Sequence, residues 1–325
     1  MKACLLTLLA AASILPAASQ ADMLVAGISG DSVYRYDAGG AYLGVFASHP
    51  TLMDGPSAMV YNSGGSLLVL NEFSHNVLKF DGATGAFISE FISPTALGSV
   101  GVSDPDDMEI GPDGNLYVTS HFNSVANIFK FDGITGVYLG IFAASLPVHH
   151  EHGLAFGPGG HLYQGNVDSG LVERFNGVTG AAMGSFTSGP VGPIGDLVYG
   201  PTHLNVACGS TGGVAKYDAI TGAFLGYLIA PGSSHWGMTI DSGTLYVSNL
   251  DTGEIRKYNT ATDAFLGDFI AAGPGAFDLL MMPPVPEPRS AALFLGGLAV
   301  LAVIFRRKNL SRSGALPSSP LKTYR

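Results

Sequence analysis

The chain has little charge and almost no cysteine. Only 12% of its 325 residues are Asp, Glu, Lys or Arg, and there is a single tryptophan. The two cysteines are Cys4 and Cys208, and Cys4 lies in an N-terminal apolar segment. If this segment is a signal peptide that is removed, Cys208 is the one cysteine left and the mature chain cannot form an internal disulfide. We expect Cys208, in the apolar run 203–208, to be a small buried residue of a strand.

Sequence signatures of common catalysts are also missing. The chain has no Gly-x-Ser-x-Gly nucleophile elbow, no phosphate-binding loop and no dinucleotide fingerprint. Positive charge is scarce in the middle, because residues 22–285 hold seven Lys or Arg against 24 Asp or Glu, a net charge of −17. Such an acidic body repels phosphate backbones, so we expect no nucleic-acid partner.

Glycine, by contrast, is abundant, and a repeated block fills the middle of the chain. With 45 glycines and 19 prolines, the composition is typical of short strands joined by tight turns. A hairpin motif of an aromatic residue, Asp or Asn, a turn and a second apolar run recurs from Tyr36, Phe80, Phe131, Phe175, Tyr217 and Tyr258. The intervals of 44, 51, 44, 42 and 41 residues match one four-stranded propeller blade. We predict an all-β fold, a six-bladed β-propeller over residues 22–284.

The first repeat lacks an inner strand, because the mature chain begins too late to supply one. The missing copy occurs at the far end, in residues 278–281. We expect this last strand to complete the first blade and close the ring, which removes open sheet edges. One basic residue precedes each repeat aromatic, and this equivalent place in every blade favours a scaffold role for Arg35, Lys79, Lys130, Arg174, Lys216 and Lys257.

One blade carries a further family likeness. The run Gly111-Pro112-Asp113-Gly114-Asn115-Leu116-Tyr117-Val118, followed by 128–132, resembles NHL-type and related six-bladed propellers, and residues 157–163 repeat the pattern. The resemblance implies a fold and leaves the function open.

Both ends of the chain look like targeting segments. Lys2, the apolar run 5–15 and small residues at 19–21 predict a signal peptide over residues 1–21, cleaved before Asp22. At the other end, Pro286-Glu287-Pro288 precedes an apolar run at 290–305, which would rise about 24 Å as a transmembrane helix. The basic residues Arg306, Arg307 and Lys308 follow and should stay in the cytoplasm.

This order of motif, short helix and basic cluster over residues 285–308 resembles the PEP-CTERM sorting signal of bacteria with exopolysaccharide-rich envelopes. The resemblance implies an exosortase-type partner that recognises Pro286, Glu287 and Pro288. Residues 309–325 depart from the pattern by extending beyond it, as a basic tail that we expect to be disordered. The expected destination is the outer surface or extracellular matrix, with transient anchoring in the inner membrane.

We place the candidate binding surface at the mouth of the central channel, on the face formed by the loops before the inner strands. The candidate residues there are acidic, histidine or tryptophan residues: Asp106, Asp107, His121, His150, Glu151, His152, Asp196, His235, Trp236 and Asp278. His150 and His152, or Asp106 and Asp107, are candidate metal ligands, so zinc and calcium stay open as cofactors. Asp104, Glu109, Asn166 and Asp168 are further oxygen donors for calcium. Adjacent strand residues point to opposite faces, so His149, His150, Glu151 and His152 cannot all bind one ion.

Two functions follow from this reading. The first is a non-enzymatic, monomeric surface propeller that binds an envelope or exopolysaccharide component. The alternative is a metal-dependent hydrolase or lyase at the channel mouth, similar to lactonase-like or streptogramin-lyase-like propellers.

Overall fold

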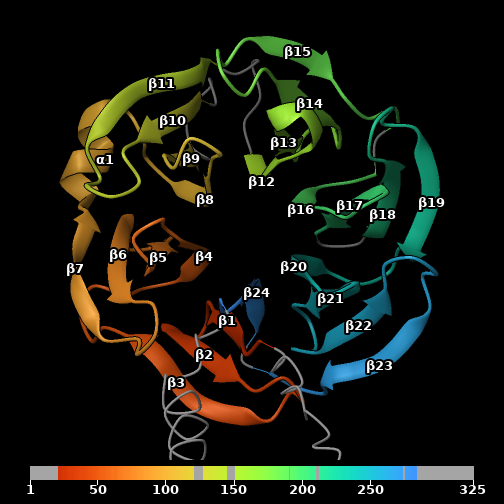
Figure 1. Ribbon diagram of the computed structural model, residues 1–325, viewed down its shortest axis with the longest axis horizontal. Coiled ribbons are helices and arrows are strands. Elements are labelled where there is room, and N and C mark those ends of the chain that lie inside the picture. Colours follow the sequence, from red (N-terminus) through yellow and green to blue (C-terminus); the bar gives the residue numbers. More distant parts are fainter. Residues whose placement is uncertain are drawn as a thin grey trace, which may run out of the picture. The chain divides into compact units, whose positions relative to one another are not determined.

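The computed structural model describes residues 21–120, 127–144, 151–189, 191–209, 212–273 and 275–283. The chain divides into two units, Met1–Pro283 and Pro284–Arg325, and all the described residues lie in the first. This unit consists of six four-stranded antiparallel sheets arranged as blades around a central axis (Figure 1). The six-bladed propeller predicted from the repeats is confirmed.

Each blade has four strands, from the innermost strand next to the axis to the outermost strand. The strands at each position are given in the order of blades 1 to 6. The innermost strands are β24 (Ala276–Met281), β4 (Pro56–Tyr61), β8 (Pro105–Ile110), β12 (Glu151–Phe156), β16 (Ile194–Tyr199) and β20 (His235–Asp241). The second strands are β1 (Met23–Gly27), β5 (Ser66–Asn71), β9 (Leu116–Ser120), β13 (Leu162–Asn166), β17 (His203–Cys208) and β21 (Thr244–Asn249).

The third strands are β2 (Ser32–Tyr36), β6 (Asn76–Asp81), β10 (Asn127–Phe131), β14 (Val172–Phe175), β18 (Gly213–Asp218) and β22 (Ile255–Asn259). The outermost strands are β3 (Tyr42–Ser48), β7 (Phe87–Ile92), β11 (Tyr138–Ala144), β15 (Ala182–Ser185), β19 (Phe224–Ile229) and β23 (Phe265–Ile270). A single turn of 3-10 helix, Pro158–Gly160, joins β12 to β13.

The ring closes within one sheet. β24, from the end of the domain, pairs antiparallel with β1, from its beginning, and Met23 lies opposite Met281. The expectation that residues 278–281 complete the first blade is confirmed. The first blade therefore has four strands, like the other five blades of the described ring.

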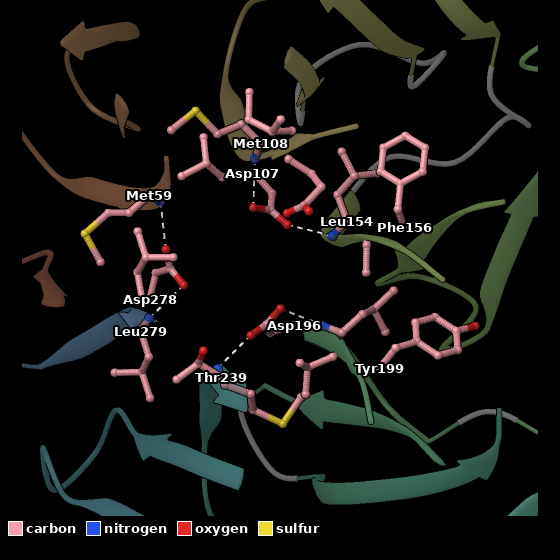
Figure 2. A pocket seen from close by; sticks show the side chains of 18 of the residues that line it. Met59, Asp107, Met108, Leu154, Phe156, Asp196, Tyr199, Thr239, Asp278 and Leu279 are labelled. Carbon is pink, nitrogen blue, oxygen red and sulfur yellow. Dashed lines mark hydrogen bonds between the residues drawn. The ribbon is translucent and has the colours of Figure 1, made fainter. Parts of the chain in front are cut away.

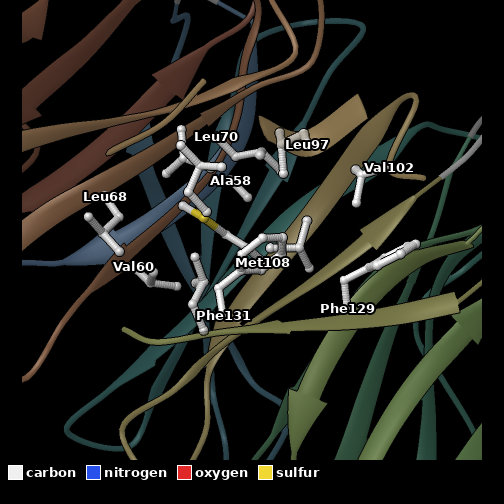
Figure 3. Close-up of a cluster of buried hydrophobic side chains, with 13 residues drawn as sticks. Ala58, Val60, Leu68, Leu70, Leu97, Val102, Met108, Phe129 and Phe131 are labelled. Atoms are coloured by element: carbon white, nitrogen blue, oxygen red, sulfur yellow. The ribbon is translucent and has the colours of Figure 1, made fainter. Parts of the chain in front are cut away.

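Apolar side chains fill the spaces between neighbouring blades. The cluster between blades 2 and 3 contains Leu68, Met108 and Phe131, all at most 2% exposed (Figure 3). Leu97 in the helix α1 (Pro94–Val100) joins the same cluster. Ser93 caps α1 by accepting from the Ala96 N–H, and α1 lies within the longest repeat interval of 51 residues.

The repeated basic residues have a structural role. Arg35, Lys79, Lys130, Arg174 and Lys257 each lie 5.6–5.9 Å from the ring centre of a phenylalanine of their own blade. Four of these phenylalanines lie on the outer strand, and Phe186 directly follows it. In blade 5 the phenylalanine is replaced by Leu228, and Lys216 instead pairs with Asp263 of blade 6. These contacts agree with the scaffold role expected from the repeat.

Cys208 lies fully buried in β17 and is a free thiol. No helix among the described residues is long and apolar enough to cross a membrane. The predicted signal peptide, the Pro286-Glu287-Pro288 motif, the helix at 290–305 and the tail at 309–325 lie outside the described residues.

Candidate functional site

The inner strands are irregular at the level where they line the central channel. The pairing of β4, β8, β12, β16, β20 and β24 with the neighbouring strand shifts register at this level, as at a β-bulge. A bulge leaves backbone groups out of the sheet ladder. Because this backbone faces the centre of the molecule, each N–H that leaves the ladder needs another acceptor.

Three aspartates supply those acceptors (Figure 2). Asp107 accepts from the N–H of Met108 in its own strand at 2.7 Å and from that of Leu154 in blade 4 at 2.6 Å. Asp196 accepts in the same way from Leu197 and from Met238 in blade 6, both at 2.6 Å.

Asp278 completes the set by accepting from Leu279 and from Met59 in blade 2, both at 2.7 Å. Both oxygens of each carboxylate are thus engaged, and each aspartate joins two blades that are consecutive in the ring. We call Asp107, Asp196 and Asp278 the carboxylate ring.

The ring residues alternate with small residues around the channel. Asp107, Asp196 and Asp278 stand in blades 3, 5 and 1, and the aligned positions in blades 2, 4 and 6 hold Ala58, Gly153 and Gly237. A Cβ at Gly237 would lie 2.7 Å from the Phe277 carbonyl oxygen, and one at Gly153 would lie 3.1 Å from the Asp196 backbone. Three carboxylates with two oxygens each therefore serve one N–H in each of the six blades.

Below the carboxylate ring lies a cavity of about 530 Å³, lined by the second halves of the inner strands. Its wall combines apolar side chains, among them Val60, Val198 and Leu280, with polar groups in equal measure. Glu109 adds a fourth carboxyl group to the three of the ring. Glu109 is half-buried and accepts no hydrogen bond from the described residues. The larger cavity therefore lies on the opposite side of the ring from the face that the sequence analysis favoured.

Enclosure and mutual repulsion raise the pKa values of these four acids. Burial, followed by the charge of Asp278, raises the pKa of Asp107 to about 8. Burial also raises that of Glu109 to about 8, with further contributions from Asp107 and Asp278. Burial raises the pKa of Asp278 to about 6 and that of Asp196 well above its usual value. The hydrogen bonds from backbone N–H groups act in the opposite direction, but burial prevails.

Above the ring, aromatic side chains fill the mouth of the channel. Trp236 stacks on Phe277 with ring centres 4.9 Å apart, and His152 meets Trp236 edge-on at 5.1 Å. His152 Nε2 lies 4.0 Å from Asp106 Oδ2, and both residues are buried. The cavity among these groups measures only about 20 Å³, which is little more than one water molecule.

Other predicted site residues take different places. His235 is fully buried inside blade 6, where its Nδ1 meets the Ser248 carbonyl oxygen and its Nε2 meets the Ser233 hydroxyl, both at 2.9 Å. Its assignment to the channel mouth is corrected, because neighbouring strand residues point to opposite sides and Trp236 takes the channel side. Asp104 pairs with His75 at 3.0 Å.

Some of the candidate metal ligands lie within the described residues and others lie outside them. Within the described ranges, no three His, Cys, Asp or Glu side chains are placed to hold one metal ion. His121, His149 and His150 lie outside these ranges, as does the side chain of Glu151.

Sequence reasoning found the ring aspartates individually but missed their arrangement. The signal was present: aligning the six inner strands puts Asp, Ala, Asp, Gly, Asp and Gly at one position. Glu109 stands two residues after Asp107 on the same strand, and only the structure shows that it faces the lower cavity.

Comparison with known proteins supports the fold. No protein-family model matches the chain, and no curated protein matches it significantly. Among solved structures, one chain of a nidogen–laminin complex is similar with a TM-score of 0.66 and 11% identity, over 82% of this chain and 99% of that one.

Two similar structures are described as gluconolactonases. A gluconolactonase from Xanthomonas campestris has a TM-score of 0.50 and 18% identity, over 71% of this chain and 84% of its own. A putative gluconolactonase has a TM-score of 0.54 and 15% identity, over 72% and 87%. At these identities the likeness establishes the propeller fold alone.

The carboxylate ring generates a first prediction. Replacing Asp196 with Ala leaves the N–H groups of Leu197 and Met238 without their acceptor, so we expect a loss of about 2 kcal/mol or more in the free energy of unfolding. Urea titration at pH 6 measures it. The control is Asp241→Ala, which removes a carboxylate outside the channel and should change the free energy by about 0.5 kcal/mol or less. Equal losses in the two variants would contradict the bridging role.

The raised pKa values generate a second prediction. The folded channel keeps protons that the unfolded carboxyls release, so stability should fall as the pH rises from about 4 to about 8. Glu109→Gln removes one of these acids and should raise the Tm by a few degrees at pH 8.5, with little change at pH 4. Thermal unfolding followed by circular dichroism checks this, with the exposed Glu90→Gln as control. A wild-type Tm that is higher at pH 8.5 than at pH 5 would contradict the prediction.

Proposed function

We propose that this protein is an exported propeller that acts as a non-enzymatic binding module for an envelope or exopolysaccharide component. The observation that carries the proposal is the engagement of the carboxylate ring. Asp107, Asp196 and Asp278 accept backbone N–H bonds with both oxygens, as structural groups do. These bonds fix each carboxyl group between two strands, whereas a catalytic base faces its substrate.

The aromatic groups above the ring support the same conclusion. Trp236, Phe277 and His152 occupy the channel mouth, and the cavity left among them is too small for a sugar or lactone. Recognition of a large partner on the outside of the propeller fits the filled mouth better than turnover of a small substrate at that mouth.

The targeting segments support the proposed location. The signal-peptide pattern at 1–21 favours export, and the PEP-CTERM-like segment at 285–308 favours sorting by an exosortase-type enzyme at the cell envelope. Under this proposal the propeller is delivered to the outer surface or the extracellular matrix.

A second candidate function is a metal-dependent hydrolase or lyase. It is favoured by the fold likeness to two proteins described as gluconolactonases and by the buried His152–Asp106 pair. In this alternative His152, His150, Asp106 or Asp107 would hold a calcium or zinc ion that activates water.

One experiment separates the two functions. The domain from Asp22 to Pro283 is tested for binding to a panel of immobilised bacterial polysaccharides. It is then tested for turnover of glucono-δ-lactone and glycans with added Ca²⁺ or Zn²⁺. We expect saturable binding to at least one polysaccharide and no turnover. Turnover that needs a stoichiometric metal ion and disappears in His152→Ala would overturn the binding module in favour of the enzyme. Absence of both binding and turnover would contradict both functions.

The sorting part of the proposal has its own test. In the full chain, replacing Pro286, Glu287 and Pro288 with Ala should leave the protein unprocessed in the inner-membrane fraction. Mass spectrometry of the C-terminal peptide and cell fractionation measure this in a host that has an exosortase. The control is Pro320→Ala in the tail, which should be processed like the wild type. Identical processing of both variants would exclude recognition of the motif.

A further inference from the structure

A hollow lined by tyrosines lies where the ring closes, between blade 6 and blade 1. The third and outer strands of blade 1, β2 and β3, lie beside β23 of blade 6 there (Figure 1). The hollow measures about 490 Å³, and its walls are Tyr34, Tyr36, Tyr42, Phe269, Ile270 and residues 271–273. We call it the Tyr groove. Its size is within the range of roughly 300–1,000 Å³ typical of ligand pockets.

The tyrosines form one aromatic surface. The ring centre of Tyr42 lies 5.4 Å from that of Tyr36 and 6.2 Å from that of Tyr34. Tyr42 is 56% exposed, so a broad amphipathic face is open to solvent.

This boundary differs from the equivalent boundaries between other blades. The position of Tyr34 is occupied elsewhere by Leu78, Phe129, Glu173, Ala215 and Arg256, and blade 1 alone has tyrosine there. Between blades 1 and 2, His49 covers the aromatic Phe87 at 4.5 Å.

Between blades 2 and 3, helix α1 follows the outer strand and packs Leu97 into the cluster that holds Phe129. Next to the Tyr groove, the described residues 271–273 after the outer strand are Ala271, Ala272 and Gly273, whose small side chains do not cover the tyrosines.

The tyrosine hydroxyls are available for a ligand. Tyr61, Tyr117 and Tyr217, which lie outside the groove, donate to Gly82, Asp113 and Gly189 respectively. The hydroxyls of Tyr34, Tyr36 and Tyr42 make no hydrogen bond with any described residue. Three adjacent groups that can both donate and accept therefore line the groove.

A second hollow extends the groove at Gly273. It measures about 420 Å³ and is lined by Ser29, Gly30, Asp251 and Thr252 among others. Gly30 lies against the Tyr34 hydroxyl, where a side chain would overlap it. The two hollows share Gly273, so an aromatic half and a hydroxyl and carboxylate half lie next to each other.

We propose that this groove binds a neutral carbohydrate chain, an inference that rests on the proposed binding function and names its ligand class and place. A pyranose ring presents an apolar C–H face, which stacks on tyrosine rings, and hydroxyls at its rim, which pair with phenol, Ser29, Thr252 and Asp251 oxygens. The net charge of −17 over residues 22–285 disfavours acidic polysaccharides. A proline-rich peptide would match the aromatic half but offers few donors to Asp251.

The test is calorimetric titration of the domain from Asp22 to Pro283, which contains the whole ring. The probes are maltotetraose, cellotetraose and tetra-N-acetylchitotetraose, with tetragalacturonate and a proline-rich decapeptide as contrasting ligands. We expect at least one neutral tetrasaccharide to bind. Tyr42→Ala should weaken this binding by about tenfold or more, and Tyr34→Phe, which removes only a hydroxyl, by about threefold or more. The matched control is Phe265→Ala, because Phe265 is equally exposed at 56% but lies on blade 6 away from the groove.

Each outcome decides a different point. Glycan binding that is unchanged in both Tyr42→Ala and Tyr34→Phe overturns the groove and leaves the binding module standing. No binding of any neutral tetrasaccharide overturns the groove, while the panel of immobilised polysaccharides separately decides the function. Binding of the decapeptide or tetragalacturonate in place of the neutral sugars, with the same dependence on Tyr42, overturns the ligand class. Thermal unfolding of each variant ensures that a loss of binding is not a loss of fold.

Discussion

The acceptance of backbone N–H groups by three aspartates holds the centre of this propeller together. The inner strands bulge toward the axis, and without an acceptor each bulge would leave a donor unsatisfied in an enclosed space. Asp107, Asp196 and Asp278 resolve this with the fewest charges, because each serves its own strand and the next blade. The small residues Gly153 and Gly237 let their strands approach the next aspartate-bearing strand closely, across the boundaries that no carboxylate bridges.

This arrangement bears on function because it uses the acidic groups that a catalytic channel would need. The three ring aspartates belong to the scaffold, and the aromatic side chains above them fill the mouth. An open surface that carries aromatic, hydroxyl and carboxylate side chains occurs instead where blade 6 meets blade 1. There the short connection after β23 leaves tyrosines uncovered. A rigid ring with a recognition surface on its side suits a protein that must hold a polymer outside the cell.

Much of the fold could be predicted from the sequence because each blade repeats the same hairpin chemistry. The aromatic residue, the Asp or Asn turn and the glycine recur at blade spacing, and the displaced run 278–281 predicted the closure. Helix α1 escaped prediction because it interrupts one repeat only, although Ser93 and Pro94 are ordinary start signals.

The candidate site was harder to predict than the fold. Asp107, Asp196 and Asp278 were recognisable as acids near the channel, but their role depends on bulges that sequence patterns do not reveal. His235 and Trp236 are neighbours in sequence with opposite environments, since the strand directs one into the blade and the other into the channel. The Tyr groove was overlooked because Tyr36 and Tyr42 occupy aromatic positions of the repeat, so the repeat does not distinguish them from the equivalent residues of other blades.

The alternation of aspartate and small residue has a consequence for how many blades this architecture can have. Each aspartate needs a following blade that carries alanine or glycine, so blades occur in ordered pairs: 1 with 2, 3 with 4, and 5 with 6. A ring with an odd number of blades would place two aspartate blades, or two small-residue blades, side by side. In the first case two carboxylates would compete for one backbone N–H, and in the second one backbone N–H would have no carboxylate. A ring that keeps this alternation throughout therefore has an even number of blades, and blades can be added to it only in pairs.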